Sequence, residues 1–313
     1  MKLAPKLYKA ISIQTYMMHV IITAYEEPKA TEQAVNALLN QETKEKFKVI
    51  VTDPFPEVEE FIINKFSDKV EFILDEGEGK SYALNMILRR FYSENKDDIL
   101  IFTDGDVYTG KTAIQFIVDG FKDPEIGVIC GKPVSLNPRN NKFGFWSQLL
   151  FTEMDKTRKR LSSKKEFFEA SGYLFAIRNG VLTEFPTEAS EDNVIPILFW
   201  KKGYKIKYVP AEVFVLNPQN KKDWLNQKKR NIKGHIALQK IFQSEIIGRK
   251  NTFFGEAFRG VAIFFTFPKN PKEFFWTIEL MFMRLQAWKL ASKEKDYKDG
   301  WREEEIGSTK PLD

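Results

Sequence analysis

The chain has 313 residues, of which 43% are hydrophobic and 29% charged, a composition typical of a globular protein with a substantial core. Lysine and arginine exceed aspartate and glutamate by 48 to 43 without any zinc-finger or RNA-binding motif, so nucleic acid is not an expected partner. Cys130 is the only cysteine and there are two histidines, which excludes an internal disulfide and disfavours a His/Cys zinc site. A single cysteine and the lack of a convincing signal-peptide core predict a cytoplasmic protein.

Strand-like and helix-like segments alternate through the first hundred residues. Expected strands over 19–25, 47–53 and 70–74 are followed by expected helices over 29–40, 54–66 and 82–92. Pro28 suits the first turn of the first of these helices. Such alternation predicts an α/β fold with a mostly parallel sheet flanked by helices.

The stretch 99–106, Ile-Leu-Ile-Phe-Thr-Asp-Gly-Asp, has the pattern of a buried strand that ends in two carboxylates. Asp104 and Asp106 would lie at the carboxyl edge of the sheet, where open α/β sheets bind ligands. Gly105 between them lets the backbone approach a ligand closely. Two such carboxylates suit Mg²⁺ or Mn²⁺ bridged to a diphosphate, whereas the alternative is that Asp-Gly is simply a turn signal.

Gly79-Lys80-Ser81 resembles the end of a phosphate-binding loop. A P-loop needs a glycine five positions before Gly79, and residue 74 is leucine, so that motif is excluded. Lys80 at the start of a helix remains a candidate phosphate contact, the alternative being an exposed lysine in a glycine turn. No G-x-G-x-x-G follows the first strand, which counts against a dinucleotide-binding domain.

These segments together resemble glycosyltransferase family 2, which has the GT-A fold. The matching sequences are Ile-Ile-Thr-Ala-Tyr-Glu-Glu at 21–27, Val-Ile-Val-Thr-Asp at 49–53, Gly-Lys-Ser-Tyr-Ala-Leu-Asn at 79–85 and Thr-Asp-Gly-Asp at 103–106. The resemblance implies that a nucleotide sugar is bound by Thr23, Ala24, Tyr25, Glu27, Asp53, Lys80 and Asp104. It also implies that Asp106 is the main metal ligand, with Asp104 beside it. Asp53 would suit uracil N3–H, so a UDP-sugar is the first expectation, with guanine donors left open.

The second half of the chain carries further motifs of the family. Residues 168–178 resemble its acceptor-side strand, and Glu191-Asp192 occupies the place of its Glu-Asp pair. The resemblance implies that Asp192 is the general base of an inverting enzyme, with Glu191 as its neighbour. A carboxylate can take the proton of an acceptor hydroxyl as its oxygen attacks the anomeric carbon. The alternative is that Ser190-Glu191-Asp192 only caps a helix.

Residues 227–234 match the family's Q-x-x-R-W element except at its last position, where Asn231 replaces tryptophan. Gln227 and Arg230 would face the pyrophosphate or the acceptor, and the missing tryptophan makes a processive polysaccharide synthase less expected. The alternative is a solvated basic helix face. His235 is a possible further metal ligand, although a lone histidine is commonly structural.

The C-terminal region from 246 to 313 is expected to be a helical extension of a catalytic domain spanning 1–245. The apolar run 258–267 is too short to cross a bilayer. A helix over 272–290 would be amphipathic, with Phe274, Ile278, Met281, Leu285 and Trp288 on its apolar face and Lys272, Glu279 and Gln286 opposite. That face could lie on a membrane or cover the catalytic domain. The basic run 156–165 is either solvated or a contact for a phosphorylated acceptor or an anionic membrane surface.

The resemblance therefore predicts a glycosyltransferase dependent on Mn²⁺ or Mg²⁺ that transfers a sugar from a nucleotide-diphosphate donor to a saccharide or lipid-linked acceptor. We expect it in the cytoplasm, as a peripheral protein on the cytoplasmic face of the membrane. Two alternatives stay open. One is a sugar-nucleotide nucleotidyltransferase, although its glycine-rich basic signature is missing after the first strand. The other is a non-catalytic carbohydrate-binding or membrane scaffold protein.

Overall fold

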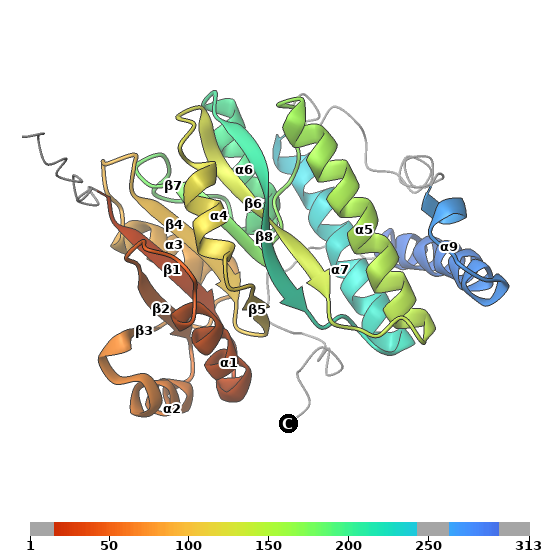
Figure 1. Cartoon of the computed structure of the whole chain (residues 1–313), viewed down its shortest axis with the longest axis horizontal. Helices are drawn as coiled ribbons and strands as arrows, with labels where there is room; N and C mark the ends of the chain where they lie inside the picture. The colour runs from red at the N-terminus through yellow and green to blue at the C-terminus, as the bar shows by residue number, and fades with distance from the viewer. Residues whose placement is uncertain (1–15, 243–262, 294–313) are drawn as a thin grey trace, which may run out of the picture.

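A computed structural model of the protein describes residues 16–242 and 263–293, in which eight strands form a single sheet of order β3-β2-β1-β4-β7-β6-β8-β5 (Figure 1). The strands are β1 (Met18–Thr23), β2 (Lys48–Asp53), β3 (Val70–Leu74), β4 (Ile99–Asp104), β5 (Val107–Thr109), β6 (Ile126–Ser135), β7 (Leu174–Arg178) and β8 (Lys205–Val215). β1 to β4, β6 and β8 run in one direction, and β5 and β7 run against them. The prediction of a mostly parallel sheet is confirmed.

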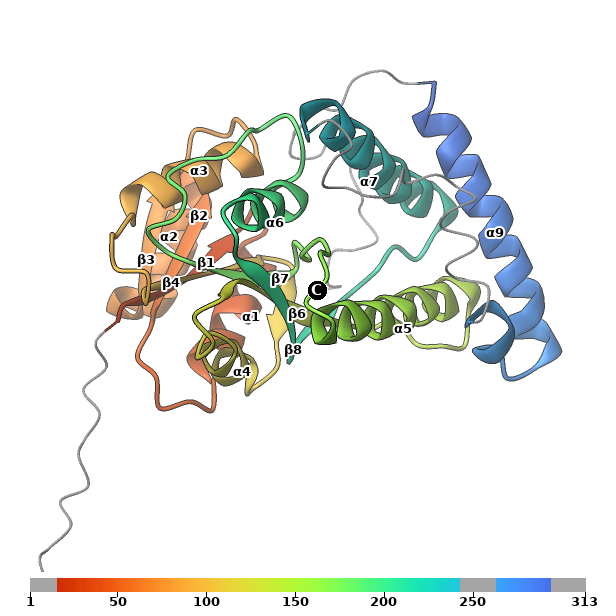
Figure 2. The same ribbon diagram turned by 90° about the horizontal axis from the view of Figure 1, so that it is seen from above.

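Helices cover both faces of this sheet (Figure 2). On one face lie α1 (Pro28–Leu39), α2 (Pro56–Phe66) and α4 (Ala113–Gly120), and on the other lie α3 (Lys80–Arg90) and α6 (Glu191–Lys201). Neighbouring residues of a strand point to opposite faces, so Ile22 packs in the first layer and Ile21 in the second, both fully buried. Burial on both faces explains why β1 and β4 read as continuous apolar runs.

The carboxyl ends of the parallel strands meet along one edge of the sheet. The register pairs Thr23 at the end of β1 with Thr52 of β2 on one side and with Asp104 at the end of β4 on the other. Asp53 closes β2 one residue further on. Polar side chains that are far apart in the sequence therefore lie side by side at this edge.

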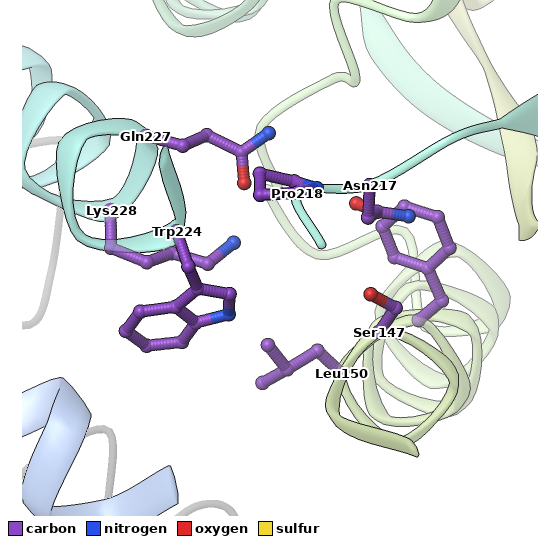
Figure 3. A pocket seen from close by; sticks show the side chains of 8 residues that line it. Ser147, Leu150, Asn217, Pro218, Trp224, Gln227 and Lys228 are labelled. Atoms are coloured by element: carbon purple, nitrogen blue, oxygen red, sulfur yellow. The ribbon is translucent and has the colours of Figure 1, made fainter. Parts of the chain in front are cut away.

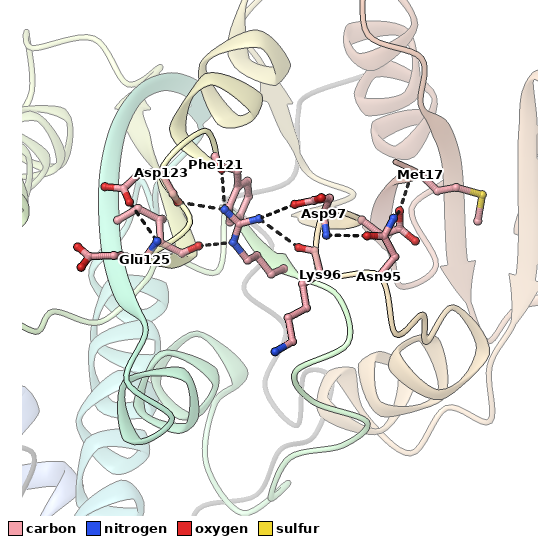
Figure 4. Close-up of polar contacts among 10 residues, drawn as sticks. Met17, Asn95, Lys96, Asp97, Phe121, Asp123 and Glu125 are labelled. Carbon is pink, nitrogen blue, oxygen red and sulfur yellow. Dashed lines mark hydrogen bonds and ion pairs between the residues drawn. The ribbon is translucent and has the colours of Figure 1, made fainter. Parts of the chain in front are cut away.

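Arg178, the last residue of β7, lies at the opposite edge of the sheet, near Phe121, Asp123 and Lys96 (Figure 4). Its guanidinium donates to the carbonyl oxygens of Phe121 (2.6 Å), Ile126 (2.7 Å), Asp123 (3.0 Å) and Lys96 (3.1 Å). Burial lowers the pKa of Arg178, and these carbonyl contacts compensate for the water it has lost. Arg178 therefore has a structural role at this edge, whereas the polar side chains described above lie at the carboxyl edge.

Three long helices form a separate layer beside the sheet: α5 (Lys142–Ser163), α7 (Lys221–Phe242) and α9 (Pro271–Ala291). They share an aromatic cluster in which the rings of Trp146 and Trp224 meet at 5.4 Å and Leu280 of α9 is fully buried. The predicted boundary at 245/246 and the first half of the run 258–267 lie outside the described residues. In the described part of the chain, α9 packs directly on α5 and α7.

A buried ion pair fastens α9 to the rest of the protein. Nε and Nη2 of Arg139 donate to the two carboxylate oxygens of Glu273 at 2.8 Å each, and the guanidinium lies 4.2 Å from the ring centre of Phe267. The hydrogen bonds from Arg139, reinforced by the backbone N–H of Lys269, lower the pKa of Glu273 to about 2. Glu273 is only 6% exposed, so an unpaired partner would be costly.

We expect Glu273→Ala to lower the free energy of unfolding at neutral pH by about 2–3 kcal/mol, somewhat less than for a fully buried pair because Arg139 keeps some contact with water. Urea denaturation measures this directly. The matched control is Glu279→Ala on the same helix, which removes a more exposed pair with Lys142 and should cost less than about 1 kcal/mol.

The contribution of Glu273 has a defined pH window. Its folded-state pKa lies below that of the unfolded chain, so the stabilisation is complete above the unfolded value and is lost as the pH falls toward about 2. Equal losses for Glu273→Ala and Glu279→Ala would contradict the role given to this pair.

Candidate functional site

Lys80 lies at the centre of the polar groups on the carboxyl edge. Its Nζ is 2.6 Å from Oδ1 of Asp104 and 2.6 Å from Oε1 of Glu191. Burial alone would lower the pKa of Lys80, but the charges of the two carboxylates outweigh it and raise that pKa above its usual range. Lys80 is therefore a buried, charged bridge between β4 and α6, and the alternative of an exposed turn lysine is wrong.

Local backbone geometry puts Lys80 in this place. Gly79 precedes α3 with φ +125°, a conformation that residues with a side chain rarely adopt. Lys80 is then the first residue of the helix, at the end where the backbone N–H groups favour negative charge. The ammonium of Lys80 and the N-terminus of α3 therefore both favour binding of an anion at this place.

Asp192 lies in the first turn of α6, immediately after Glu191. Its Oδ2 accepts the backbone N–H of Gly172 at 3.1 Å. Burial and then the charge of Glu191 raise the pKa of Asp192 to about 6, while Lys80 opposes this shift. A carboxylate with a pKa near neutrality suits a general base, and its place at a helix N-terminus is compatible with the capping alternative as well.

Gly172 is the point at which these three side chains meet. A Cβ atom added there would lie 3.4 Å from Oε1 of Glu191, 3.5 Å from Oδ2 of Asp192 and 3.6 Å from Nζ of Lys80. Glycine keeps this space open beside the charged groups. Sequence reasoning assigned residues 168–178 to the acceptor side without naming Gly172.

Gly105 allows the Asp-Gly-Asp turn to pass tightly against the end of β1. Its backbone N–H donates to the carbonyl of Thr23 at 2.8 Å, and an added Cβ would lie 2.8 Å from the Cβ of Ala24. The hydroxyl of Thr23 lies 3.3 Å from Oδ1 of Asp104. This contact holds Asp104 in place and leaves Asp106 partly exposed two residues further on.

Tyr173 is a site residue that sequence reasoning missed. Its pKa is raised above the usual range, first by burial and then by the negative charges of Asp106 and Asp104, while Arg230 of α7 acts in the opposite direction. Asp192 also contributes to the rise. The charges of the Asp-Gly-Asp turn, of the predicted base and of the predicted pyrophosphate contact therefore all act on one phenol. The sequence signal for this residue is its place in the acceptor-side segment, directly after Gly172.

Asp53 has a structural role in this structure. It is fully buried, and its two carboxylate oxygens accept the backbone N–H groups of Glu26 (3.0 Å) and Phe55 (2.9 Å). Burial raises its pKa to about 6 despite these bonds. Asp53 thereby joins the loop after β1 to the loop after β2, where the rings of Tyr25 and Phe55 meet edge to face at 5.1 Å. Ala24 is buried and Glu27 half-buried in the same loop.

Gln227 lines a small pocket between α5 and α7 with Ser147, Asn217, Pro218 and Trp224 (Figure 3). Oε1 of Gln227 and Nδ2 of Asn217 are buried, and neither has a hydrogen-bond partner within the described chain. Trp224 forms an aromatic wall of this pocket, and Gln227 and Asn217 are among its lining residues. So small a pocket suits a water molecule.

His235 is not brought to the Asp-Gly-Asp turn. It lies on α7 with Nδ1 3.4 Å from Oε1 of Glu169. Within residues 16–242 and 263–293, no three His, Cys, Asp or Glu side chains are grouped so that they could hold a metal ion. The expectation that His235 adds a metal ligand therefore stays a prediction, and the contact that the structure gives this imidazole is with Glu169.

The carboxylates of Asp104 and Asp106 still fit a divalent cation of the expected type. Mg²⁺ commonly uses one or two protein carboxylates and takes its remaining ligands from substrate phosphates and water, and Mn²⁺ prefers the same oxygen donors. A cage of three protein ligands is therefore not required. Lys80 pairs with Asp104, and Asp106 is half-exposed. In such a site the remaining ligands of the cation would come from the substrate diphosphate and water.

The basic run 156–165 lies on α5 and the turn after it. Arg158 donates to the carbonyl of Ala170 at 2.6 Å, which ties α5 to the acceptor-side segment. Lys159 pairs with Asp155 on the same helix at 2.8 Å. The solvated alternative describes most of this run, apart from Arg158.

The model of the family described as "Glycosyl transferase family 2" matches residues 19–185, more than half of the chain. No curated protein matches the chain in sequence.

Solved structures are similar to this chain. The mannosyltransferase PcManGT from Pyrobaculum calidifontis, solved with GDP-Man and Mn²⁺, superposes with a TM-score of 0.55 at 19% identity, covering 89% of this chain and 76% of that one. TarS 1-349 from S. aureus, solved with UDP-GlcNAc, gives a TM-score of 0.45 at 16% identity, covering 71% of this chain and 66% of that one.

Proposed function

The chain belongs to glycosyl transferase family 2 and is a glycosyltransferase with a GT-A-type fold, and from this we propose that it transfers a sugar from a nucleotide-diphosphate donor to an acceptor hydroxyl with inversion. The observation that carries the proposal is the convergence on Gly172 of Lys80, Glu191 and Asp192 beside the Asp-Gly-Asp turn. An anion-binding cation and a carboxylate base are the two groups that such a transfer needs.

Asp192 acts as the general base in this proposal. Its carboxylate takes the proton of the acceptor hydroxyl while that oxygen bonds to the anomeric carbon, and the bond from this carbon to the diphosphate breaks on the opposite side. The released diphosphate carries the electron pair away. Its charge is met by the ammonium of Lys80 at the N-terminus of α3, and Arg230 supplies a further cation from α7.

We propose that Asp106, with Asp104, holds Mn²⁺ or Mg²⁺ together with the donor diphosphate. The bound ion would supply charge stabilisation for the departing diphosphate. The hard oxygen donors support this assignment, and the structural neighbour PcManGT was solved with Mn²⁺. Thr23 would keep Asp104 oriented through its hydroxyl.

A UDP-sugar is the donor that we propose first. The loop of Ala24, Tyr25 and Glu27, which Asp53 holds against the end of β2, would receive the base. Each carboxylate oxygen of Asp53 accepts one backbone N–H and keeps a second lone pair, so a contact from Asp53 to uracil N3–H stays part of the proposal. A GDP-sugar is the second candidate, since PcManGT was solved with GDP-Man.

Thermal unfolding with nucleoside diphosphates tests this donor site. We expect one of UDP, GDP, CDP and ADP to raise the melting temperature, and to do so only when Mn²⁺ is present. A ligand at 100 times its Kd adds about 2.7 kcal/mol to the folded state. The matched variant Asp106→Asn should melt normally alone and lose the nucleotide-dependent rise.

Two results would redirect the assignment. No shift with any nucleotide, in a protein shown to be folded, would favour the non-catalytic scaffold. A larger shift with a nucleoside triphosphate than with the diphosphate would favour the nucleotidyltransferase.

The acceptor that we propose is a saccharide carried by a lipid and presented at the cytoplasmic face of a membrane. Gln227 and its pocket would lie on the acceptor side. We propose that residues 1–245 form the catalytic unit and that 246–313 form an extension that associates with the membrane peripherally. In the part of the chain described here, no helix combines the length and apolar character needed to cross a bilayer.

A further inference from the structure

Helix α9 is apolar on two sides. One side packs on α5 and α7 and buries Leu280, Ala287 and Ala291 completely. The other side carries six large apolar residues that are 38–69% exposed: Phe274, Phe275, Ile278, Met281, Phe282 and Leu285. Phe265, 69% exposed, extends this surface, because its ring lies 6.3 Å from that of Phe274. We call these seven residues the outer face of α9.

The helical period explains why these side chains form a continuous surface. Residues 274, 278, 281 and 285 recur at spacings of three and four and so form one stripe, with Phe275 and Phe282 seven apart beside it. In both views α9 lies at the outer side of the helical layer (Figures 1 and 2). Monomeric proteins seldom expose so large a contiguous apolar patch unless it binds something.

The charges around the outer face are unbalanced. The two glutamates of α9 are neutralised by cations from elsewhere, Glu273 by Arg139 and Glu279 by Lys142. The exposed lysines at the ends of the face are Lys269, Lys272, Lys289 and Lys293. None of these four lies within ion-pair distance of a carboxylate in the described residues, so the charge remaining here is positive.

We propose that the outer face of α9 is the surface by which the protein docks on an anionic membrane. Aromatic and aliphatic side chains would enter the boundary between headgroups and acyl chains, while the lysines at both ends bind anionic headgroups. A single convex helix face needs no shape-matched groove, which a fluid bilayer does not offer. Several phenylalanines bordered by lysines thus match a lipid surface better than a protein partner.

The packing of α9 connects this surface to the site. α9 contacts α7, whose first turns carry Gln227 and Arg230, and it contacts α5, whose Arg158 bonds to the acceptor-side segment. A membrane bound at the outer face would hold these helices in a fixed orientation to it. This inference rests on the proposed function in one respect only, namely that the membrane carries a lipid-linked acceptor.

Vesicle flotation of the full-length protein tests the docking surface. The vesicles contain phosphatidylcholine alone or phosphatidylcholine with phosphatidylglycerol. We expect flotation with the anionic vesicles, weakened by high salt. The variant Phe275→Ser/Phe282→Ser changes the two most exposed rings of α9 and should bind at least about 10-fold more weakly, because each buried ring contributes strongly to apolar transfer. The matched control Phe116→Ser, which alters an exposed ring of α4, should bind like the wild type.

Each other outcome overturns the proposal in a recognisable way. If the wild-type protein floats with neither vesicle, yet shows the nucleotide-dependent melting shift, the membrane-docking proposal is wrong and the proposed sugar transfer from a nucleotide donor stands. Flotation that the double variant retains would place membrane contact elsewhere. A concentration-dependent dimer that the double variant converts to monomer would make the outer face a subunit interface. Circular dichroism melts of the variants verify that they fold, as expected for exposed positions.

Discussion

Replacing Asp192 with asparagine is expected to lower kcat for sugar transfer by about 10²–10⁴-fold. Asparagine has nearly the same shape and can still accept the backbone N–H of Gly172, but it cannot take the proton of the acceptor hydroxyl. The melting shift with nucleotide and Mn²⁺ should persist, because the donor site is unchanged. The control Asp119→Asn makes the same chemical change on the surface of α4 and should leave kcat unaltered.

The pH profile gives a second and independent reading of the same residue. Burial and the charge of Glu191 raise the pKa of Asp192 to about 6, and only the ionised carboxylate can act as a base. Wild-type kcat should therefore fall as the pH decreases through about 6, by about tenfold per pH unit well below that value. The residual activity of Asp192→Asn should lack this fall at low pH, which is the acid limb of the profile. A variant with the wild-type rate and the wild-type limb would show that another group is the base.

The elements that are determined locally could be predicted from the sequence. The predicted stretch 99–106 contains β4, which ends at Asp104, the first of its two carboxylates, and Pro28 marks the start of α1. The order of the strands could not be predicted in this way. β7 runs antiparallel between β4 and β6, with Ala176 opposite Ile101, and such pairings depend on contacts between distant segments that local periodicity does not encode.

The candidate site was predictable as separate residues but not as an arrangement. Sequence motifs identified Lys80, Asp104 and Glu191, yet only the folded chain brings Lys80 between the two carboxylates. For Asp53 the sequence indicates a ligand contact, which stays a prediction. The structure adds a role that the motif does not encode: the carboxylate joins two backbone loops, because buried N–H groups must find acceptors.

Periodicity alone did not determine which side of α9 contacts protein. The apolar stripe that the sequence predicts is largely the exposed side, and Trp288 alone of its five residues is half-buried. The packed side contains Leu280 and Met283 together with Glu273, Thr277 and two small alanines. Its glutamate can be buried because Arg139 arrives from a distant segment, which hydrophobic patterning cannot anticipate.

Replacing Lys80 with methionine should change both donor binding and the titration of Asp192. Removing the ammonium deprives the diphosphate of a charge-assisted contact worth about 1.5–3 kcal/mol, so KM for the donor should rise roughly 10- to 100-fold. The charge of Lys80 also opposes the raised pKa of Asp192. Without it that pKa should rise further, and the acid limb of kcat should move to higher pH. Steady-state kinetics across the pH range measures both effects.

Glu191→Gln is the matched variant, because it acts on Asp192 with the opposite sign. The negative charge of Glu191 raises the pKa of Asp192, so neutralising it should move the acid limb to lower pH. Opposite displacements in the two variants would establish that the Lys80–Glu191 bridge tunes the base. If Lys80→Met raised KM while leaving the limb in place, Lys80 would serve the donor alone. The 2.6 Å contact with Glu191 would then position Lys80 without affecting the pKa of Asp192.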